Sequence, residues 1–243
     1  MNETFHPVEP HDAEPHSSGV GNRLNRMRAG VLGANDGIVS TAGLVVGVTA
    51  AAPTNTAAIL TAGVAGLLSG AVSMAVGEYV SVSTQRDTER ALIAQEQQEL
   101  HDDPEREFHE LIHLLRRQGL KPATARVVAR ELTDHDALGS HLNLELGIDG
   151  AELTSPWQAA AASFVAFTFG ALLPVLAVLL TPVPQWRIPV TFVIVVLTLL
   201  LTGWTSARLG GAPASRAIAR IVVGGALGML VTWVAGALLG SAG

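Results

Sequence analysis

The sequence predicts an all-α integral membrane protein with five transmembrane helices and a helical domain inserted between the second and the third. Apolar residues make up 49% of the 243 residues and charged residues only 15%, whereas charged residues form about a quarter of soluble domains. The charges are also unevenly spread, because 15 of the 21 acidic residues lie between Thr84 and Ser155. A lipid-embedded chain with one polar insertion accounts for both observations.

Five apolar stretches are long enough to cross a bilayer, which takes about 20 helical residues at about 1.5 Å each. They are Ala29–Ala52, Ala57–Ser83, Trp157–Leu180, Ile188–Ala207 and Ala214–Leu239. Glycine pairs within them, such as Gly43/Gly47 and Gly236/Gly240, have the spacing at which helices pack closely in membranes. That spacing is common in a chain with 25 glycines, so it indicates packing and only weakly a dimer.

The stretches divide the chain into four parts. We expect a disordered cytoplasmic tail, the first two transmembrane helices, a cytoplasmic helical metal-binding domain and the last three transmembrane helices. The corresponding residues are 1–22, 23–83, 84–155 and 156–243.

Arginine residues predict the orientation of the chain, because cytoplasmic connections are enriched in Lys and Arg. Arginines cluster before the first stretch and between the fourth and the fifth. They are Arg23, Arg26, Arg28, Arg208, Arg216 and Arg220. The connection at residues 53–56 is uncharged, and the one after the third stretch holds only Arg187. Alternation from a cytoplasmic N-terminus therefore puts every cluster and the insertion in the cytoplasm, and the C-terminus outside.

The insertion predicts helices and no strands. Its first part continues the second span with strong helix formers and without Gly or Pro. Pro104 suits the first turn of a new helix, with Asp102 or Asp103 as its cap, and a glycine follows the last residue of two of the expected helices. Helices are expected over residues 84–100, 104–118, 122–133 and 136–146.

Two ionisable residues lie inside the predicted spans, Asp36 in the first and Glu78 in the second. A carboxylate in hydrocarbon is unfavourable and normally faces a cavity or a partner. At about 1.5 Å per residue, Asp36, Met74 and Glu78 lie at comparable depths and can line one transport cavity. Two carboxylates and a thioether suit a first-row metal better than magnesium or calcium. The alternatives are that Met74 only packs and that Glu78 reaches toward the headgroups.

The insertion holds three sets of candidate metal ligands at helical spacing. Members of a set are three or four residues apart and share a helix face. The candidates are Glu96, Glu99, Glu107, Glu110, His113, His141 and Glu145. Such residues hold metal in di-iron helical bundles, and carboxylate with imidazole suits iron, manganese, cobalt or zinc. The alternative is a solvated charged face.

Several classes of protein are excluded by composition. The chain has no cysteine, which excludes disulfides, thiolate zinc sites and cysteine nucleophiles. All eight histidines lie outside the predicted spans, so no intramembrane enzyme is predicted, and neither is a nucleic-acid partner. The first 22 residues lack the basic start and apolar core of a signal peptide. Their three histidines, His6, His11 and His16, either bind metal weakly or have no role in metal binding.

Three segments carry a resemblance to a known family. They are GVLGANDGIVSTAGLVVGV in the first span, GLLSGAVSMAVGEYVSVSTQRDTE across the second and LNLELGI before the third. From about Arg23 to the C-terminus, the chain resembles the vacuolar iron transporter family, known from yeast as the calcium-sensitivity cross-complementing transporters. The resemblance implies five transmembrane helices, a homodimer and a cytoplasmic metal-binding domain, which together exchange iron(II) for protons.

The resemblance also implies roles for individual residues. The transport-path aspartate and methionine match Asp36 and Met74. The cytoplasmic metal-binding glutamates match Glu96, Glu99, Glu107, Glu110 and Glu145. Plant members have a path glutamate where this chain has Gly66, so Glu78 is a candidate replacement. They have a methionine where this chain has His141, whose imidazole binds metal only when neutral.

We therefore expect a divalent-metal transporter for iron(II) or manganese(II), working as a metal/proton antiporter that exports metal from the cytoplasm. Cobalt(II) and zinc(II) are further candidates for binding, and no permanent cofactor is expected. The short loops and the lack of an organelle signal predict a bacterial protein in the plasma membrane. The alternative is a membrane-anchored metal buffer or sensor, which binds metal without moving it.

Overall fold

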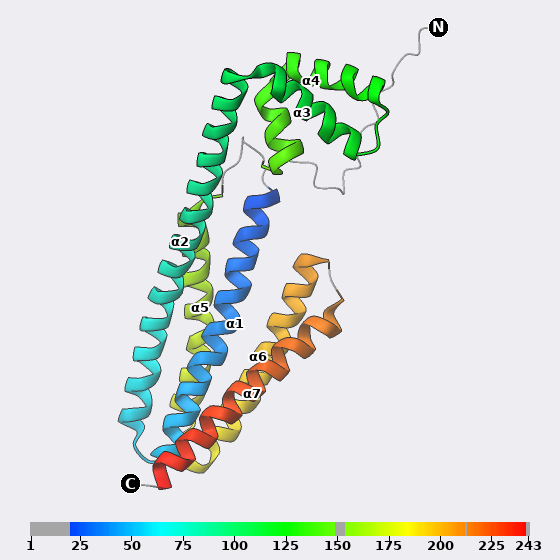
Figure 1. Ribbon diagram of the computed structural model, residues 1–243. Coiled ribbons are helices and arrows are strands. Elements are labelled where there is room, and N and C mark those ends of the chain that lie inside the picture. The colour runs from blue at the N-terminus through cyan, green and yellow to red at the C-terminus, as the bar shows by residue number, and fades with distance from the viewer. Residues whose placement is uncertain (1–19, 149–153, 212, 242–243) are drawn as a thin grey trace. The chain divides into compact units, whose positions relative to one another are not determined.

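The computed structural model describes residues 20–148, 154–211 and 213–241. Within these ranges every regular element is a helix (Figure 1). The elements are α1 Val20–Ala51, α2 Thr56–Asp102, α3 Pro104–Arg117, α4 Pro122–His141, the π-helix η1 Leu142–Leu146, α5 Pro156–Leu179, α6 Pro184–Gly210 and α7 Ala214–Ser241. The predicted tail and its three histidines lie outside the described residues.

Five of these helices, α1, α2, α5, α6 and α7, are long and apolar enough to cross a membrane. The predicted all-helical class and the five candidate spans are therefore confirmed. α2 has 47 residues and is about 70 Å long, more than twice the roughly 30 Å of a bilayer core. Its polar second half continues the apolar first half without a break, as predicted.

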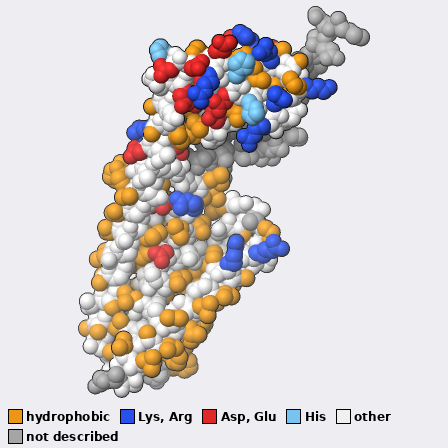
Figure 2. Space-filling model, in the orientation of Figure 1, with side chains coloured by type: hydrophobic (Ala, Val, Ile, Leu, Met, Phe, Trp, Pro, Cys, Tyr) orange, Lys and Arg blue, Asp and Glu red, His pale blue; other side chains and the backbone are white. Residues whose placement is uncertain are grey.

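The chain forms two compact units. Of the described residues, 20–24, 83–148 and 154 belong to unit 1, and 25–82, 155–211 and 213–241 belong to unit 2. Unit 2 contains the apolar helices, and unit 1 contains α3, α4, η1 and the polar half of α2. In Figure 2 the surface of α3 and α4 carries many charged side chains, whereas the helices of unit 2 show mostly apolar ones.

Helix α1 is the centre of unit 2. Its Ile38 packs against α6 and α7 in one apolar cluster, and its Val45 packs against α2 and α5 in another. Large apolar side chains on the outer faces of the surrounding helices stay exposed, for example Leu68, Phe169 and Leu201. Apolar side chains on the outside are expected where lipid rather than water surrounds the helices.

Close approach of α1 to its neighbours depends on glycine. A Cβ atom at Gly37 would collide with the carbonyl oxygen of Phe167 in α5, and one at Gly236 in α7 would collide with that of Gly47. At Gly43 a Cβ atom would lie 3.2 Å from the Thr232 side chain of α7. The glycine pairs of α1 and α7 therefore pack helices within this chain, which is the packing role expected from the sequence.

Unit 1 is built on two helices with a shared apolar core. α3 begins as predicted, with Pro104 in its first turn and the Asp103 side chain accepting a hydrogen bond from the Arg106 amide at 3.1 Å. The core between α3 and α4 is formed by buried Leu111, Leu115, Ala125 and Ala129.

The two helices expected over residues 122–133 and 136–146 form one kinked helix followed by a π-helical turn. The kink lies at Asp136, with φ −159° and ψ 90°, and the Asp136 side chain accepts a hydrogen bond from the Gly139 amide at 2.9 Å. Gly147, with φ 64°, ends the π-helical turn, because this left-handed conformation suits glycine.

Replacement of Gly37 by alanine is predicted to loosen the contact between α1 and α5. The new methyl group must push the helices apart at the Phe167 carbonyl, and such overpacking typically costs about 1–3 kcal/mol. Gly224→Ala is the matched control, because nothing lies within 4 Å of a Cβ atom there. Thermal unfolding in detergent should show a lower midpoint for Gly37→Ala only. Equal midpoints for the two variants would contradict the close approach.

Candidate functional site

The first candidate site is a cavity in unit 2, of about 340 Å³, with both polar and apolar lining residues. It lies against α1 and α2, with one aromatic side chain from α5. Its lining residues are Asp36, Ser40, Thr41, Leu44, Gly66, Ser69, Gly70, Ser73, Met74 and Phe167. The structure thus places Asp36 and Met74 in the lining of one cavity. Their similar depths along the first two predicted spans had suggested this arrangement.

Helical spacing explains how the cavity obtains its lining. On α2, Gly66, Gly70 and Met74 follow one another at intervals of four residues, and so do Ser69 and Ser73, so both rows share one face. The absence of a side chain at Gly70 leaves room for the Phe167 ring, which a Cβ atom there would strike. The serines were missed in the sequence analysis, although their spacing beside Met74 is a signal that could have found them.

The donor atoms of this cavity are of kinds that divalent cations bind. It offers one carboxylate, one thioether and several hydroxyl groups. The Ser40 hydroxyl donates a hydrogen bond to the Asp36 carbonyl oxygen at 2.5 Å, which leaves the Asp36 carboxylate to other partners. Carboxylate with thioether is a donor set that suits borderline first-row metals.

Glu78 does not line the cavity. Its carboxylate forms an ion pair with Arg28 of α1, with 2.6 Å between Oε1 and Nη2, and the side chain is only 7% exposed. Arg28 also donates to the Asn25 side-chain oxygen, at 3.1 Å from Nη2. The structure therefore provides a partner for Glu78 within the chain. Sequence reasoning missed Arg28, because residues fifty positions apart give no local signal of pairing.

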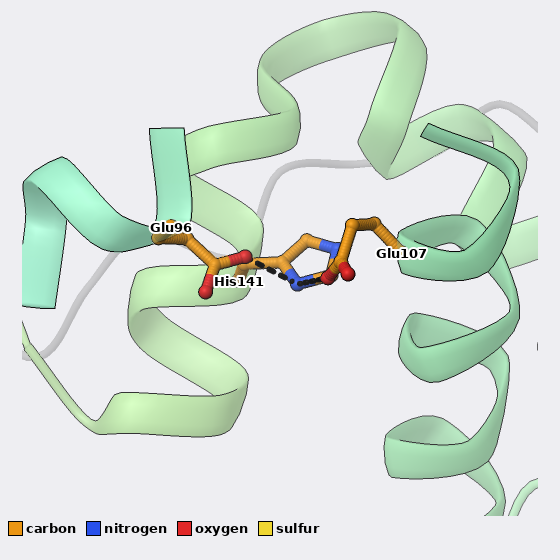
Figure 3. Close-up of side chains that lie close together, drawn as sticks. All are labelled: Glu96, Glu107 and His141. Atoms are coloured by element: carbon orange, nitrogen blue, oxygen red, sulfur yellow. Dashed lines mark ion pairs between the residues drawn. The ribbon is translucent and has the colours of Figure 1, made fainter. Parts of the chain in front are cut away.

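The second candidate site is a buried cluster in unit 1. Glu96 of α2, Glu107 of α3 and His141 of α4 each offer a ligand atom, and these atoms all lie within 4.8 Å of one another. Figure 3 shows His141 between the two glutamates. His141 Nδ1 lies 2.9 Å from Glu96 Oε1 and 3.8 Å from Glu107 Oε2. Two carboxylates and an imidazole form a donor set that suits iron, manganese, cobalt or zinc.

The π-helical turn η1 contributes a fourth group to this cluster. Glu145, in the π-helical turn after His141, has its Oε2 atom 3.4 Å from His141 Nδ1. π-helical turns are rare and occur frequently at functional sites. The kink at Asp136 and this turn together position His141 and Glu145.

The electrostatics of the cluster favour a bound cation. Burial raises the pKa of Glu107, and the negative charges of Glu110 and Glu99 raise it further, against the opposing effect of His141. Glu96 Oε1 is buried and lies 2.9 Å from His141 Nδ1. Glu96 and Glu107 repel one another when both are charged, and a metal ion between them would offset that repulsion.

The other predicted ligands of unit 1 differ in their placement. Glu99 and Glu110 lie close enough to raise the pKa of Glu107 by their charge, although Glu99 is exposed. His113 is exposed on α3 and does not join the group of potential ligands found among the described residues. The helical spacing that links His113 with Glu110 was therefore not sufficient to bring it into the cluster.

Comparison with known proteins supports a relationship over nearly the whole chain. A vacuolar iron transporter of Acanthamoeba castellanii is 40% identical over 222 residues, which cover 91% of this chain and 81% of the relative. Vacuolar iron transporter homolog 2 of Arabidopsis thaliana is 36% identical over 218 residues, covering 90% and 86%. Vacuolar iron transporter homolog 5 of Oryza sativa is 36% identical over 211 residues, covering 87% and 79%.

The expected plasma-membrane location is contradicted by these relatives. Their names refer to the vacuole, which points to an intracellular organellar membrane. The physical reason for the error is that charge bias orients a chain relative to the cytoplasm but does not identify the membrane. Relatives from an amoeba and from plants also give no support to the bacterial origin inferred from the short loops.

A family model agrees with these pairwise matches. It covers residues 27–237, from the start of the first span to near the end of the last, and carries the description "VIT family". The family consists of transporters, so the chain is not an enzyme, as the sequence analysis concluded. The family model and the relatives together confirm the resemblance seen in three segments of the sequence, and the chain belongs to the VIT family.

Proposed function

We propose that this chain carries iron(II) across an organellar membrane, out of the cytoplasm and in exchange for protons. The observation that carries the proposal is the cavity that Asp36 and Met74 line together, within helices apolar enough to span a bilayer. The names of the relatives, which refer to iron transport, support the same cargo. Manganese(II) is a second candidate cargo, because carboxylate and hydroxyl oxygens suit it as well.

Proton exchange follows from the chemistry of the carboxylate. Asp36 binds a metal ion only when it is deprotonated, so protons and metal compete for it. A proton entering from the far side of the membrane would displace the ion and promote its release there. The cavity of about 340 Å³ also has room for an ion with several waters of about 30 Å³ each, which the serine hydroxyls would hold.

The proposed role of residues 84–155 is capture of metal on the cytoplasmic side. The buried group of Glu96, Glu107 and His141 offers the ligands. The high acidic content of this segment attracts cations from solution. Glu99, Glu110 and Glu145 would complete or surround the coordination shell, and the metal held here is cargo rather than a resident cofactor.

A homodimer is proposed because the cavity leaves polar groups uncovered. Ser40, Ser69 and Ser73 line the cavity and are exposed in the single chain. Polar groups facing hydrocarbon are unfavourable. A second copy packed on this face of α1 and α2 would cover them, and exposed Leu68 and Val72 would add apolar contact area.

A membrane-anchored metal buffer or sensor is the competing function. The observation in its favour is that the cluster of unit 1 is complete within one compact unit and needs no cavity in the membrane. The two functions differ in flux, because a buffer binds metal without moving it. Reconstituted protein with a metal-quenched dye inside the liposomes and an imposed pH gradient tests this difference.

Asp36→Asn is predicted to reduce gradient-driven iron(II) entry by about 10–100-fold or more, because loss of a metal ligand weakens binding at least as much as loss of its supporting contacts. Met74→Leu should reduce it less. Met229→Leu is the matched control, because Met229 is buried in the apolar core away from the cavity. Metal binding without any entry by the wild type would favour the buffer, and full entry with Asp36→Asn would contradict the assigned path.

Glu107→Gln is predicted to abolish stabilisation of the full-length protein by iron(II) under anaerobic conditions. The amide keeps the shape of the side chain but removes a charged ligand from the buried cluster. Glu131→Gln is the control, because Glu131 is exposed on α4. The midpoint of thermal unfolding with and without metal measures the effect. An unchanged metal-induced shift in Glu107→Gln would remove this cluster from the metal-binding proposal.

The cluster also predicts opposite effects of pH on the metal-free and metal-bound protein. The folded chain holds the Glu107 proton more tightly than the unfolded chain, since its pKa is raised from 4.5. The stability of the metal-free protein should therefore fall as the pH rises through the folded-state pKa. Near neutral pH, metal-free Glu107→Gln should unfold at a higher temperature than the wild type, because the amide leaves no negative charge buried in the cluster.

Metal binding should depend on pH in the opposite direction and weaken as the pH falls, because only the deprotonated carboxylate binds a cation. As the pH falls, iron(II) should be lost at a higher pH than an ordinary glutamate site would lose it. Titration of metal binding between pH 7 and pH 4.5 measures this loss. A profile that stays flat over this range would contradict the assigned role of Glu107.

A further inference from the structure

The ion pair between Arg28 and Glu78 joins α1 to α2 within unit 2. The two partners differ in their environment, because the Glu78 side chain is 7% exposed and the Arg28 side chain 53%. Among the described residues of α1 and of α2 up to Val82, Asp36 and Glu78 are the only carboxylates. Asp36 lines the cavity, whereas Glu78 is held by Arg28.

Both partners lie beyond the same end of the cavity. On α1, Arg28 precedes Asp36 by eight residues, or about 12 Å along the helix. On α2, Glu78 follows Met74 by four residues, or about 6 Å, and shares its helix face. This is the end at which α1 begins, which the arginine distribution assigns to the cytoplasm. A cation moving from that end toward the cavity would meet Glu78 before it meets Asp36.

We propose that Arg28 is a gating residue, which occupies the Glu78 carboxylate until a divalent metal ion displaces it and continues to the cavity lined by Asp36 and Met74. This inference rests on the proposed transport function. A divalent ion carries twice the charge of the guanidinium, so it competes effectively for a carboxylate that is otherwise shielded from water.

The surroundings of Arg28 allow it to leave Glu78. Its side chain is half exposed, so the guanidinium can be solvated without crossing a packed interior. Asn25, one turn earlier on α1, already accepts hydrogen bonds from Arg28 Nε at 3.3 Å and from Nη2 at 3.1 Å. This second acceptor can hold the displaced arginine on its own helix. Glu78, in contrast, is buried and remains in place as a metal ligand.

The competing explanation is a static ion pair that only fastens α1 to α2. The two explanations differ in what happens to the affinity for metal when the arginine is removed. A competitor that is removed lowers the half-saturating metal concentration, whereas loss of a fastening contact lowers stability without changing that concentration. Flux kinetics and thermal unfolding of the same variants therefore separate them.

The test measures iron(II) entry into proteoliposomes as a function of iron(II) concentration, for the full chain under a fixed pH gradient. Arg28→Gln should lower the half-saturating concentration by about fivefold, the upper end for an ion pair with one exposed partner. Arg28→Lys should stay near the wild type, since Lys also pairs with a carboxylate. Arg208→Gln is the matched control, because Arg208 is an exposed arginine at the end of another span.

The charge-swapped variant Arg28→Glu with Glu78→Arg provides a second, independent comparison. It restores an ion pair and so the thermal stability of the protein, but it puts a cation at the buried position. Iron(II) entry should fall about tenfold or more while stability stays near the wild type. Wild-type entry by the swapped variant, or an unchanged half-saturating concentration in Arg28→Gln, would overturn the gating role.

Failure of the gate can be told apart from failure of the proposed transport function. If the wild type moves iron(II) and Asp36→Asn does not, transport stands, and the Arg28 variants alone decide the gate. If the wild type moves no iron(II), the proposed transport function is wrong, and the gating role of Arg28 is rejected with it.

Discussion

The structure depends on how carboxylates removed from bulk water are compensated. A buried negative charge needs a cation, hydrogen-bond donors or a polar cavity, because the low-dielectric interior does not solvate it. This chain uses three solutions. Asp36 faces a cavity with hydroxyl groups, Glu78 is paired with Arg28, and Glu96 and Glu107 surround His141. Of these carboxylates, Asp36 lines a cavity, whereas Glu78 is paired with Arg28 and the two glutamates of unit 1 lie beside His141.

Close packing of α1 makes the first solution feasible. Glycines at Gly37 and Gly236 let α1 approach the backbones of α5 and α7, so the helix is held on two sides by backbone contact. Its third side, toward α2, is then free to carry Asp36 and Ser40 beside the small residues of that helix. The cavity therefore lies on the side of α1 that faces α2, where Gly66 and Gly70 have no side chains.

The fold was largely predictable, and the sites were predictable only in part. Hydropathy identified the five spans because it does not depend on how the helices are rotated, and Pro104 with Asp103 marked a helix start by local chemistry alone. The rotation of each helix about its own axis decides which side chains reach the sites. Spacing puts Glu110 and His113 on one face of α3, but it does not tell which part of that face turns inward. The structure leaves His113 exposed and buries Glu107.

Contacts between distant residues were the part that sequence alone did not reveal. The partner of Glu78 is Arg28, and the kink at Asp136 that positions His141 replaces an expected break between two helices. Both depend on tertiary packing, because nothing in the local sequence specifies which side chain of α1 lies beside Glu78. Local signals therefore predicted boundaries such as the start of α3 at Pro104 but not the continuity of α4, and tertiary contacts decided which carboxylates are paired.

The difference in composition between the two sites follows the demands of transport. A site along a path must bind well enough for an ion to enter and weakly enough for it to leave. The cavity offers one carboxylate and one thioether, and Gly66 contributes no ligand there. The cluster of unit 1 gathers two buried carboxylates and an imidazole, with their ligand atoms within 4.8 Å. Under the proposed function, the cluster of unit 1, which has more charged ligands, captures metal. The cavity, which has fewer, passes the ion across the membrane. A Cβ atom at Gly66 would lie 2.5 Å from Leu44 Cδ2, so the glycine makes room for Leu44 in the lining of the cavity.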